Sequence, residues 1–339
     1  MQSRTYKINH VMSRDIDSGI FAAILGYFKK YSPAWIEHIE SVRPIEGADV
    51  YHYHRPQLES SLVKNAVCTV HHDLNDTDPW HARHHFIPRY AEAAAVICLN
   101  ETQKQILSTE EGLSRNKLFV APHGYNHELL SIRAPRSGLG EKFTLGIASR
   151  RYGRRVKGEA YLHELLKRLD PALVKFVLVG QDRSLDAIEM RKLGFEAEVF
   201  ERLPYRVFQG FYASIDCLLM CSSHEGGPAN VPEALATGTP VLSSRVGMSI
   251  DMIVNGDNGY CLDLNPDEDA EVIHRLAVSA QAYASMEAAC RTLAVKVPTW
   301  KDSIEENLRV YGSIAGFELT NPPPVGSAVP LFDTAEIEA

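Results

Sequence analysis

The stretch Glu225-Gly-Gly-Pro-Ala-Asn-Val-Pro-Glu233-Ala-Leu-Ala-Thr-Gly-Thr-Pro240-Val decides the fold of this chain. It follows an apolar run, Asp216–Cys221, which predicts a buried parallel strand. The two glycines predict a loop, and the residues after it predict a short helix that ends at Gly238. Such a strand, loop and helix direct free backbone N–H groups and the positive end of a helix dipole at one point. An anion is expected there, and phosphate fits best.

Two carboxylates flank this expected phosphate position, Glu225 in the loop and Glu233 in the first helical turn. Because carboxylates repel phosphate, they are better placed to accept hydrogen bonds from hydroxyl groups on either side of it. Hydroxyl groups on both sides of a phosphate are typical of a nucleotide-sugar. Asn230 and Glu233 also fit a capping box, so a purely structural role for Glu233 stays open.

The stretch resembles the signature of retaining glycosyltransferases of the GT-B fold, in glycosyltransferase family 4 (glycosyl transferases group 1). This large family includes sucrose synthase and many bacterial mannosyl- and glucosyltransferases. Its members carry two glutamates separated by seven residues and followed by Ala-x-Ala-x-Gly-x-Pro-Val, and the chain matches this pattern at Glu225, Glu233, Ala234, Ala236, Gly238, Pro240 and Val241. It departs from the pattern at Gly227-Pro228, where the family often has an aromatic residue and a glycine.

The resemblance spans roughly residues 1–316 and implies an α/β chain with two Rossmann-like domains whose parallel sheets face a cleft. It implies that Glu225 accepts hydrogen bonds from sugar hydroxyls and Glu233 from the ribose. It also implies retention at the anomeric carbon, with a donor phosphate oxygen taking the proton of the acceptor. The residues expected around the donor are Gly226, Gly227, Pro228, Ala229 and Asn230.

Alternating apolar runs and amphipathic segments predict two successive βα series. The expected units are an N-terminal acceptor-side domain (1–130), a linker (131–142), a C-terminal donor domain (143–299), a helix crossing back to the first domain (300–316) and a flexible tail (317–339). The predicted strands are Tyr6–Val11, Asp49–Tyr53, Ala66–Val70, Ala95–Leu99, Leu118–Ala121, Phe143–Ala148, Lys175–Val179, Ala197–Phe200, Asp216–Cys221, Pro240–Ser244 and Tyr260–Leu262. The predicted helices include Gly19–Lys30, His81–Ala94, Glu101–Thr109, a long region Asp267–Ala294 broken once, and Trp300–Ile314.

Ser149–Gly158 holds four arginines and a lysine between a predicted strand end and a helix start. A solvated basic loop is the alternative, but the net charge of the whole chain is −8, so a local positive cluster indicates a local anion. The loop resembles the family's Gly-Arg…Lys-Gly motif, whose cations bind the donor diphosphate. Arg151 and Lys157 match that pair best, and Arg150 stays open because the usual glycine is absent. The assignment requires this loop to meet the loop at Glu225, and requires both cations to be free of other salt links.

A second set of candidates follows the strand that ends near Thr69. In the resembling family a histidine at this strand end lies beside the transferred sugar. His71 keeps the family's Thr-Val-His pattern and His72 its His-Asp pattern, so either residue could hold this position. Gly19 stands where the family places a glycine loop near the diphosphate, although an ordinary turn before a helix is the commoner explanation.

His81, His84 and His85 would share one face of a helix, with Asp73, Asp76 and Asp78 close in sequence. A metal-dependent hydrolase is therefore an alternative. The spacing matches no standard metal motif, so no metal is expected. Acceptor binding is the candidate role for His72, Asp73, His81, His84 and His85, and a polar helix face stays open for the last three.

The bulk properties limit the class of function. The net charge of −8 and the pI near 6.0 argue against a general nucleic-acid binder. We expect a cytoplasmic protein, with the inner face of the membrane as an alternative, because no apolar run of about 18 residues and no signal-peptide core is seen. The sequence predicts a metal-independent retaining glycosyltransferase without a cofactor. It would move a hexose-type sugar from a nucleotide-diphosphate sugar to a hydroxyl-bearing glycan, lipid-linked or small-molecule acceptor, in polysaccharide or glycoconjugate biosynthesis. A nucleotide-sugar epimerase and a non-catalytic nucleotide-sugar-binding protein stay open as alternatives.

Overall fold

The computed structural model describes residues 4–13, 19–136 and 140–320. Its N-terminal domain holds a six-stranded parallel sheet in the order β2-β1-β3-β4-β5-β6. The strands are β1 (Tyr6–Val11), β2 (Ile36–Ser41), β3 (Val50–Tyr53), β4 (Ala66–Thr69), β5 (Ala95–Cys98) and β6 (Leu118–Val120). The sequence predicts five of these six strands. It misses β2, because Ile36-Glu-His-Ile-Glu-Ser alternates in polarity, as an edge strand does, and is not a continuous apolar run.

The helices of this domain are α1 (Gly19–Tyr31), α2 (Ile87–Glu92) and α3 (Glu101–Gln105), which continues as a π-helix (Ile106–Glu110). The cap expected for α3 is confirmed, since the Asn100 side chain accepts the backbone N–H of Gln103 and the Gln103 side chain accepts that of Leu99. The single helix predicted over residues 81–94 is wrong. A 3-10 turn (Arg83–His85) precedes α2, and Pro88 lies in the first turn of α2, where its missing N–H costs nothing.

The C-terminal domain holds a second six-stranded parallel sheet in the order β12-β11-β10-β7-β8-β9. Its strands are β7 (Phe143–Ala148), β8 (Val174–Val179), β9 (Glu196–Phe200), β10 (Cys217–Met220), β11 (Val241–Ser244) and β12 (Gly259–Leu262). Counted within the domain, this is the 3-2-1-4-5-6 order of dinucleotide-binding folds. The order reverses between β7 and β10, and ligands of such sheets bind at that reversal, beyond the carboxyl ends of the strands.

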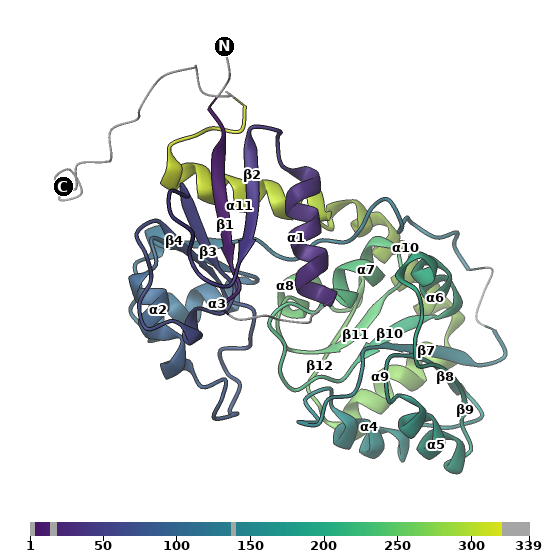
Figure 1. The fold of residues 1–339 in the computed structure, drawn as a ribbon. Coiled ribbons are helices and arrows are strands. Elements are labelled where there is room, and N and C mark those ends of the chain that lie inside the picture. The colour runs from purple at the N-terminus through teal and green to yellow at the C-terminus, as the bar shows by residue number, and fades with distance from the viewer. Residues whose placement is uncertain (1–3, 14–18, 137–139, 321–339) are drawn as a thin grey trace.

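The helices of the C-terminal domain pack against this sheet (Figure 1). They are α4 (Glu159–Leu166), α5 (Ser184–Lys192), α6 (Phe208–Ser214), α7 (Asn230–Ala236), α8 (Ser249–Met252), α9 (Pro266–Val278) and α10 (Ala280–Leu293). The predicted single break in the long helical region is confirmed at Ser279, whose side chain caps α10. No helix in the described part of the chain has both the length and the apolar character needed to cross a membrane.

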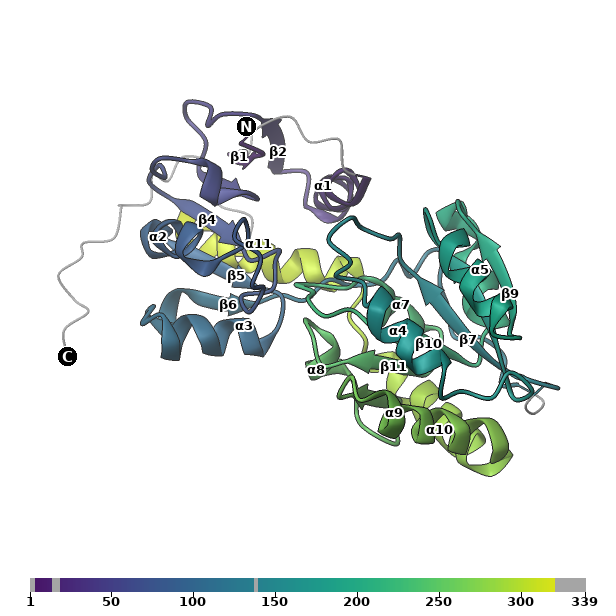
Figure 2. The same ribbon diagram turned by 90° about the horizontal axis from the view of Figure 1, so that it is seen from below.

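The last helix, α11 (Trp300–Ala315), returns to the N-terminal domain, as the sequence predicts (Figures 1 and 2). Trp300 stacks on Tyr27 of α1 with ring centroids 4.8 Å apart, and Tyr311 packs on Phe28. Phe317, where the sequence places the start of a flexible tail, is instead buried against Tyr6 in the core of the N-terminal domain. Residues 321–339 of that expected tail lie outside the described residues.

Candidate active site

The loops after β7 and β10 meet where the strand order reverses. The backbone N–H of Ser223 donates to the carbonyl of Val156 at 2.9 Å. Gly158 lies so close to the backbone of Cys221 that a side chain would overlap it, and its φ of +79° also favours glycine. The ammonium group of Lys157 forms an ion pair with the carboxylate of Glu225, and both side chains are largely buried. The structure therefore joins the two segments that the sequence assigns to one anion site.

The glycine-rich loop also presses against the N-terminal domain. A Cβ atom on Gly226 would overlap the backbone carbonyl of His71, and one on Gly227 would lie 2.6 Å from Leu99 Cδ1. Asn100 Nδ2 donates to the carbonyl of Gly226 at 3.2 Å. The departure from the family pattern at residue 227 therefore has a steric reason, because the opposite domain leaves no room for an aromatic side chain there.

His123 joins the site, although it is not among the candidates from the sequence. Its Nδ1 lies 3.2 Å from the carbonyl oxygen of Gly227, and its ring packs 5.1 Å from that of Trp300. Burial lowers the pKa of His123 to about 4, so the ring is neutral at pH 7. A neutral ring with its proton on Nδ1 can donate to that carbonyl.

Backbone donors remain available in the loop. Among the described residues, no acceptor pairs with the N–H groups of Gly226, Gly227 and Ala229. Because the carbonyls of Gly226 and Gly227 are held by the N-terminal domain, the loop conformation is fixed from that side. The loop can therefore offer its N–H groups to an anion in a fixed geometry.

Glu233 does not form the capping box that the sequence leaves open. α7 begins without a side-chain cap, and Asn230 donates instead to the carbonyl of Ala148 at 3.1 Å. The carboxylate of Glu233 accepts from the hydroxyls of Tyr205 (2.7 Å) and Tyr212 (2.8 Å). Burial raises its pKa to about 7, although these two hydrogen bonds act in the opposite direction.

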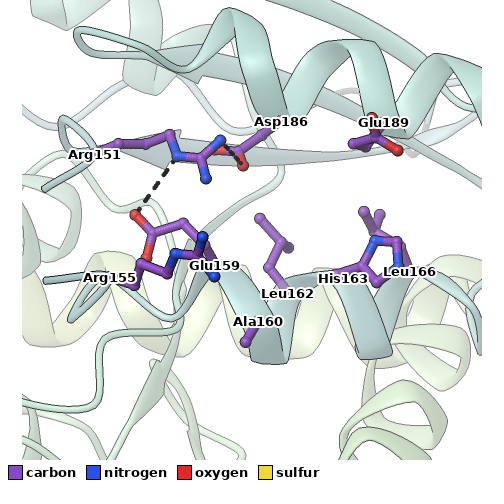
Figure 3. Close-up of a pocket in the computed structure, with 9 residues that line it drawn as sticks. All are labelled: Arg151, Arg155, Glu159, Ala160, Leu162, His163, Leu166, Asp186 and Glu189. Atoms are coloured by element: carbon purple, nitrogen blue, oxygen red, sulfur yellow. Dashed lines mark ion pairs between the residues drawn. The ribbon is translucent and has the colours of Figure 1, made fainter. Parts of the chain in front are cut away.

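Arg151 points away from the Lys157–Glu225 pair. Its guanidinium lies 3.1 Å from Asp186 and 3.9 Å from Glu159, over a cavity of about 290 Å³ between α4 and α5 (Figure 3). The expected combination of Arg151 with Lys157 at one anion is therefore not formed, because two carboxylates on other elements hold Arg151. The requirement that both cations be free of salt links is not met.

Arg150 and Lys157 both pack on the ring of Tyr152. The Arg150 guanidinium lies 4.3 Å from the centre of the Tyr152 ring, and Lys157 Nζ lies 5.4 Å from the same ring. Arg150 is exposed, and it forms no ion pair with any described residue. The alternative that the sequence leaves open for Arg150 is thus an exposed cation that packs on the same tyrosine ring as Lys157.

The two histidines after β4 face different surroundings. His72 stacks on Phe86 at 3.7 Å, its Nε2 is buried without a partner, and burial lowers its pKa to about 3. His71 lies beside Phe21 and His123, and its Nε2 is 3.1 Å from Nδ1 of His54. Because the His71 carbonyl contacts Gly226, His71 and not His72 accompanies the glycine-rich loop.

The remaining acceptor-side candidates bridge the two domains or lie on the surface. Asp73 lies 3.2 Å from Nδ1 of His224. Arg154 donates to both carboxylate oxygens of Asp76 at 2.7 Å and pairs with Asp78 at 2.6 Å. These pairs hold the loop of residues 73–78 against the C-terminal domain, a role that the sequence does not reveal.

The histidine and aspartate cluster does not assemble as the metal alternative requires. His81 lies in a turn beside Arg154, 3.0 Å from that guanidinium, whereas His84 and His85 are exposed in the following 3-10 turn. A guanidinium at this place repels a metal cation and occupies the carboxylates that would bind one. Gly19 begins α1, is exposed, and has no neighbour that would exclude a side chain.

A different histidine cluster lies inside the N-terminal domain. Within the described residues, the only group whose ligand atoms lie close enough to hold a metal is His10, His52 and His54. His52 contacts the hydroxyls of Tyr311 (2.6 Å) and Thr69 (2.7 Å). His10 and His54 contact other histidines through both ring nitrogens, so every nitrogen of the cluster already has a partner.

Comparison with known proteins bears on the fold and on the C-terminal domain. Residues 136–291 match the family model described as Glycosyl transferases group 1. This range includes both loops of the Lys157–Glu225 pair. No curated protein matches the chain.

Several solved structures are similar over nearly the whole chain. Sucrose-phosphate synthase from Thermosynechococcus elongatus has a TM-score of 0.72 and 14% identity, with 92% of this chain and 100% of that chain covered. A glycosyltransferase from Rickettsia africae has a TM-score of 0.69 and 15% identity, with 91% and 98% covered. Anabaena HepE in complex with UDP and glucose has a TM-score of 0.67 and 16% identity, with 92% and 100% covered. The two parallel sheets and these similarities confirm the GT-B fold.

Proposed function

We propose that this protein is a retaining glycosyltransferase that transfers a hexose-type sugar from a nucleotide-diphosphate sugar to a hydroxyl acceptor. The observation that carries the proposal is the meeting of Lys157, Glu225 and the His71 backbone at the reversal of strand order. A cation, a sugar-binding carboxylate and free loop N–H groups are then close together between the two domains. The match of residues 136–291 to Glycosyl transferases group 1 supports the same reading.

The hard step is cleavage of the bond between the anomeric carbon and the phosphate oxygen, because negative charge then builds on the diphosphate. Lys157, Arg150 and the N–H groups of Gly226 and Gly227 would stabilise that charge without a metal ion. Arg150 takes the role first given to Arg151, since Asp186 and Glu159 hold Arg151 elsewhere. With Arg150 in place of Arg151, the proposal keeps two cations, Arg150 and Lys157, for the diphosphate.

The salt link on Lys157 has a different meaning, because its partner is itself a proposed donor ligand. A diphosphate competes with Glu225 for the ammonium group of Lys157. Once Lys157 pairs with phosphate, the carboxylate of Glu225 is released to accept hydrogen bonds from the sugar hydroxyls. The pair thus keeps both groups charged and in place until the donor binds.

Glu233 would contact the ribose if a ribose hydroxyl took the place of one tyrosine hydroxyl as hydrogen-bond donor to its carboxylate. Tyr205 is the more exposed of the two tyrosines and is the one that would yield. The deeply buried Tyr212 would then continue to hold the second carboxylate oxygen. Because both groups are hydroxyl donors, the carboxylate of Glu233 would keep the same number of hydrogen bonds after the exchange.

Calorimetric titration with UDP, GDP and UDP-glucose tests donor binding, and UDP-sugars come first because HepE was solved with UDP and glucose. The expected result is binding without added metal. NMR of the glucose first released from UDP-glucose tests retention, which requires the α anomer. Binding of no nucleotide, or first release of the β anomer, would contradict the proposal. Conversion of UDP-glucose to another UDP-sugar without acceptor would favour an epimerase.

A further inference from the structure

Three buried histidines gather on one face of the N-terminal sheet. His10 of β1 lies opposite His52 of β3 in the strand register, and His54 follows two residues later on the same face. One ring nitrogen from each of the three lies within 4.8 Å of the other two. Phe28 of α1 and Tyr311 of α11 pack over the rings, and none of the three histidines is more than 3% exposed. We call His10, His52 and His54 the three-histidine group.

The shortest contact within the three-histidine group joins two atoms that can both bind a metal. Nδ1 of His10 lies 3.0 Å from Nε2 of His54. Two imidazole nitrogens on one tetrahedral zinc ion lie about 3.3 Å apart, because each zinc–nitrogen bond is about 2.0–2.1 Å long. The contact therefore has to widen by only about 0.3 Å to admit the ion. In exchange, one N–H···N hydrogen bond is replaced by two metal bonds.

The opposite nitrogens of these two rings already have the outer partners that metal ligands use. A metal-bound histidine normally donates its second N–H to an acceptor, which fixes the orientation of the ring. Nε2 of His10 lies 2.8 Å from Nδ1 of His38, whose own Nε2 lies 2.6 Å from the hydroxyl of Ser32. Nδ1 of His54 lies 3.1 Å from Nε2 of His71. Both rings are thus held from behind, with the facing nitrogens directed at each other.

His52 supplies the third ligand atom when one of its two hydroxyl contacts yields. Its Nδ1 lies 2.6 Å from the hydroxyl of Tyr311, and its Nε2 lies 2.7 Å from the hydroxyl of Thr69. A hydroxyl group can rotate between donating and accepting a hydrogen bond. The hydroxyl group that stays therefore accepts the remaining N–H of His52, so this ring also has an outer partner.

A cavity beside the three-histidine group has room for a fourth ligand. Its volume is about 20 Å³, and His52 and His54 line it together with Thr69, His71 and Ser303. One water molecule needs about 10–15 Å³ and polar partners, and this cavity offers both. Three histidines and one water complete a tetrahedral zinc site. Because zinc lowers the pKa of a bound water to about 7, a bound hydroxide can offset one of the two positive charges.

The three rings are in the protonation state that binds metal. Burial lowers the pKa of His10, His52 and His54 well below the ordinary value, so the rings are neutral at pH 7. The neutral imidazole is the form that ligates metal ions. Lys29, whose charge also lowers the pKa of His10, forms an ion pair with Glu40, and this pairing offsets part of its repulsion toward a metal cation.

We propose that His10, His52 and His54 bind one zinc ion as a structural site of the N-terminal domain. Imidazole ligands suit zinc, whereas magnesium and calcium require oxygen ligands. The ion ties β1 to β3 beneath α1 and α11. It takes no part in diphosphate binding, which belongs to Arg150 and Lys157 in the opposite domain. The zinc site therefore stands or falls independently of the proposed function.

Zinc binding has a consequence for the ring protons. With zinc on Nδ1 of His10 and on Nε2 of His54, His10 carries its proton on Nε2 and His54 carries its proton on Nδ1. Without zinc, the 3.0 Å contact between these rings needs one proton, since two lone pairs or two N–H groups would repel. The two neutral rings must then carry their protons on the same nitrogen, either both on Nδ1 or both on Nε2. The zinc-bound and zinc-free forms thus differ in a measurable way.

The first experiment is a zinc titration of the full chain, without an affinity tag, after treatment with a chelator. Calorimetry and elemental analysis should give one zinc ion per chain, and zinc should raise the Tm because it binds the folded state. His10→Asn and His54→Gln should each weaken zinc binding more than about 100-fold, since loss of an outer partner alone costs about 10- to 100-fold. The double variant His84→Asn, His85→Asn is the control, because both side chains are exposed and lie outside the site. It should bind zinc like the wild type.

No zinc bound at excess zinc would overturn the proposal, and so would zinc binding that is lost only in the His84 and His85 control. Should neither His10→Asn nor His54→Gln fold, the wild type still decides. X-ray absorption of the zinc-loaded protein should show three histidine nitrogens at about 2.0–2.1 Å and one oxygen. Ring 15N NMR should show the proton on Nε2 of His10 and on Nδ1 of His54 only after zinc is added. Protons on the same nitrogen of both rings at excess zinc would overturn the site.

Discussion

The ammonium group of Lys157 and the carboxylate of Glu225 form an ion pair that joins the loop after β7 to the loop after β10. Each partner restrains the other while no anion competes. A diphosphate that takes Lys157 must therefore displace Glu225, and the affinity for the diphosphate reflects both events. The two single substitutions at this pair should have opposite effects on nucleotide binding.

Lys157→Ala is expected to weaken UDP binding by about 10- to 100-fold, because a charged hydrogen bond is worth about 1.5–3 kcal/mol. Glu225→Gln is expected to strengthen UDP binding, since it removes the competing carboxylate, while UDP-glucose hydrolysis slows because sugar hydroxyls lose their acceptor. Calorimetric titration and initial rates measure the two effects. Lys301→Ala, on the exposed face of α11, is the control and should bind UDP like the wild type. Weaker UDP binding by Glu225→Gln would contradict the competition.

Arg150→Ala and Arg151→Ala should separate diphosphate binding from stability. Arg150 is the exposed cation beside Tyr152, so its loss should weaken UDP binding about 10-fold with little change in stability. Loss of Arg151 leaves Glu159 buried without its nearest cation, whereas Asp186 keeps Arg183 at 2.6 Å. Arg151→Ala should therefore lower the free energy of unfolding by about 1–3 kcal/mol and leave UDP affinity unchanged. If Arg151→Ala weakened UDP binding and Arg150→Ala did not, Arg151 would be the diphosphate-binding arginine, as the sequence predicts.

The framework of the site could be predicted from the sequence because it depends on local pattern. The apolar runs gave eleven of the twelve strands, and the spacing of Glu225 and Glu233 marked the loop and helix between β10 and β11. Which arginine faces the anion could not be predicted. Two adjacent residues leave a strand end on opposite sides, and the carboxylates that hold Arg151 come from α4 and α5.

The contacts among the histidines of the N-terminal sheet could not be predicted from the sequence for a related reason. His10, His38, His54 and His71 are far apart in the sequence, and only the parallel register of β1, β2, β3 and β4 brings them together. The link between Arg154 and Asp76 spans 78 residues and two domains. No periodicity in a single sequence carries such information, because a side-chain contact across a sheet or a cleft leaves no local pattern.

Gly227 should be sensitive to a single added methyl group. Its Cβ would lie 2.6 Å from Leu99 Cδ1 and 3.0 Å from His123 Nδ1 across the domain boundary. Gly227→Ala is therefore expected to push the loop away from the N-terminal domain and to weaken UDP-glucose binding about 10-fold. Gly210→Ala is the matched control, because nothing lies within 4 Å of its Cβ position in α6. It should bind UDP-glucose normally and gain up to about 1 kcal/mol of stability.

Glu233 should make the protein less stable as the pH rises. Its pKa is raised from 4.5 to about 7 in the folded state, so the folded protein holds this proton more tightly than the unfolded chain does. The resulting stability is present below pH 4.5 and is lost as the pH rises through about 7. Relative to Glu233→Gln, the wild type should lose about 2 kcal/mol of unfolding free energy between about pH 5.5 and 8. Urea unfolding at the two pH values measures the difference, and a constant difference would contradict the raised pKa.

His72 should have the opposite dependence on pH, because its pKa is lowered from 6.5 to about 3. The unfolded chain binds a proton below pH 6.5 that the folded protein does not accept, so stability is present above 6.5 and is lost as the pH falls toward 3. His72→Phe removes this titration and the unpartnered Nε2, while keeping a ring to stack on Phe86. The variant should be more stable than the wild type, and its advantage should be about 2 kcal/mol larger at about pH 5 than at pH 7. Urea unfolding at both pH values measures this, with the exposed His85→Phe as the control that should show no such change. If the stability advantage of His72→Phe were equal at both pH values, His72 would bind its proton as readily in the folded protein as in the unfolded chain.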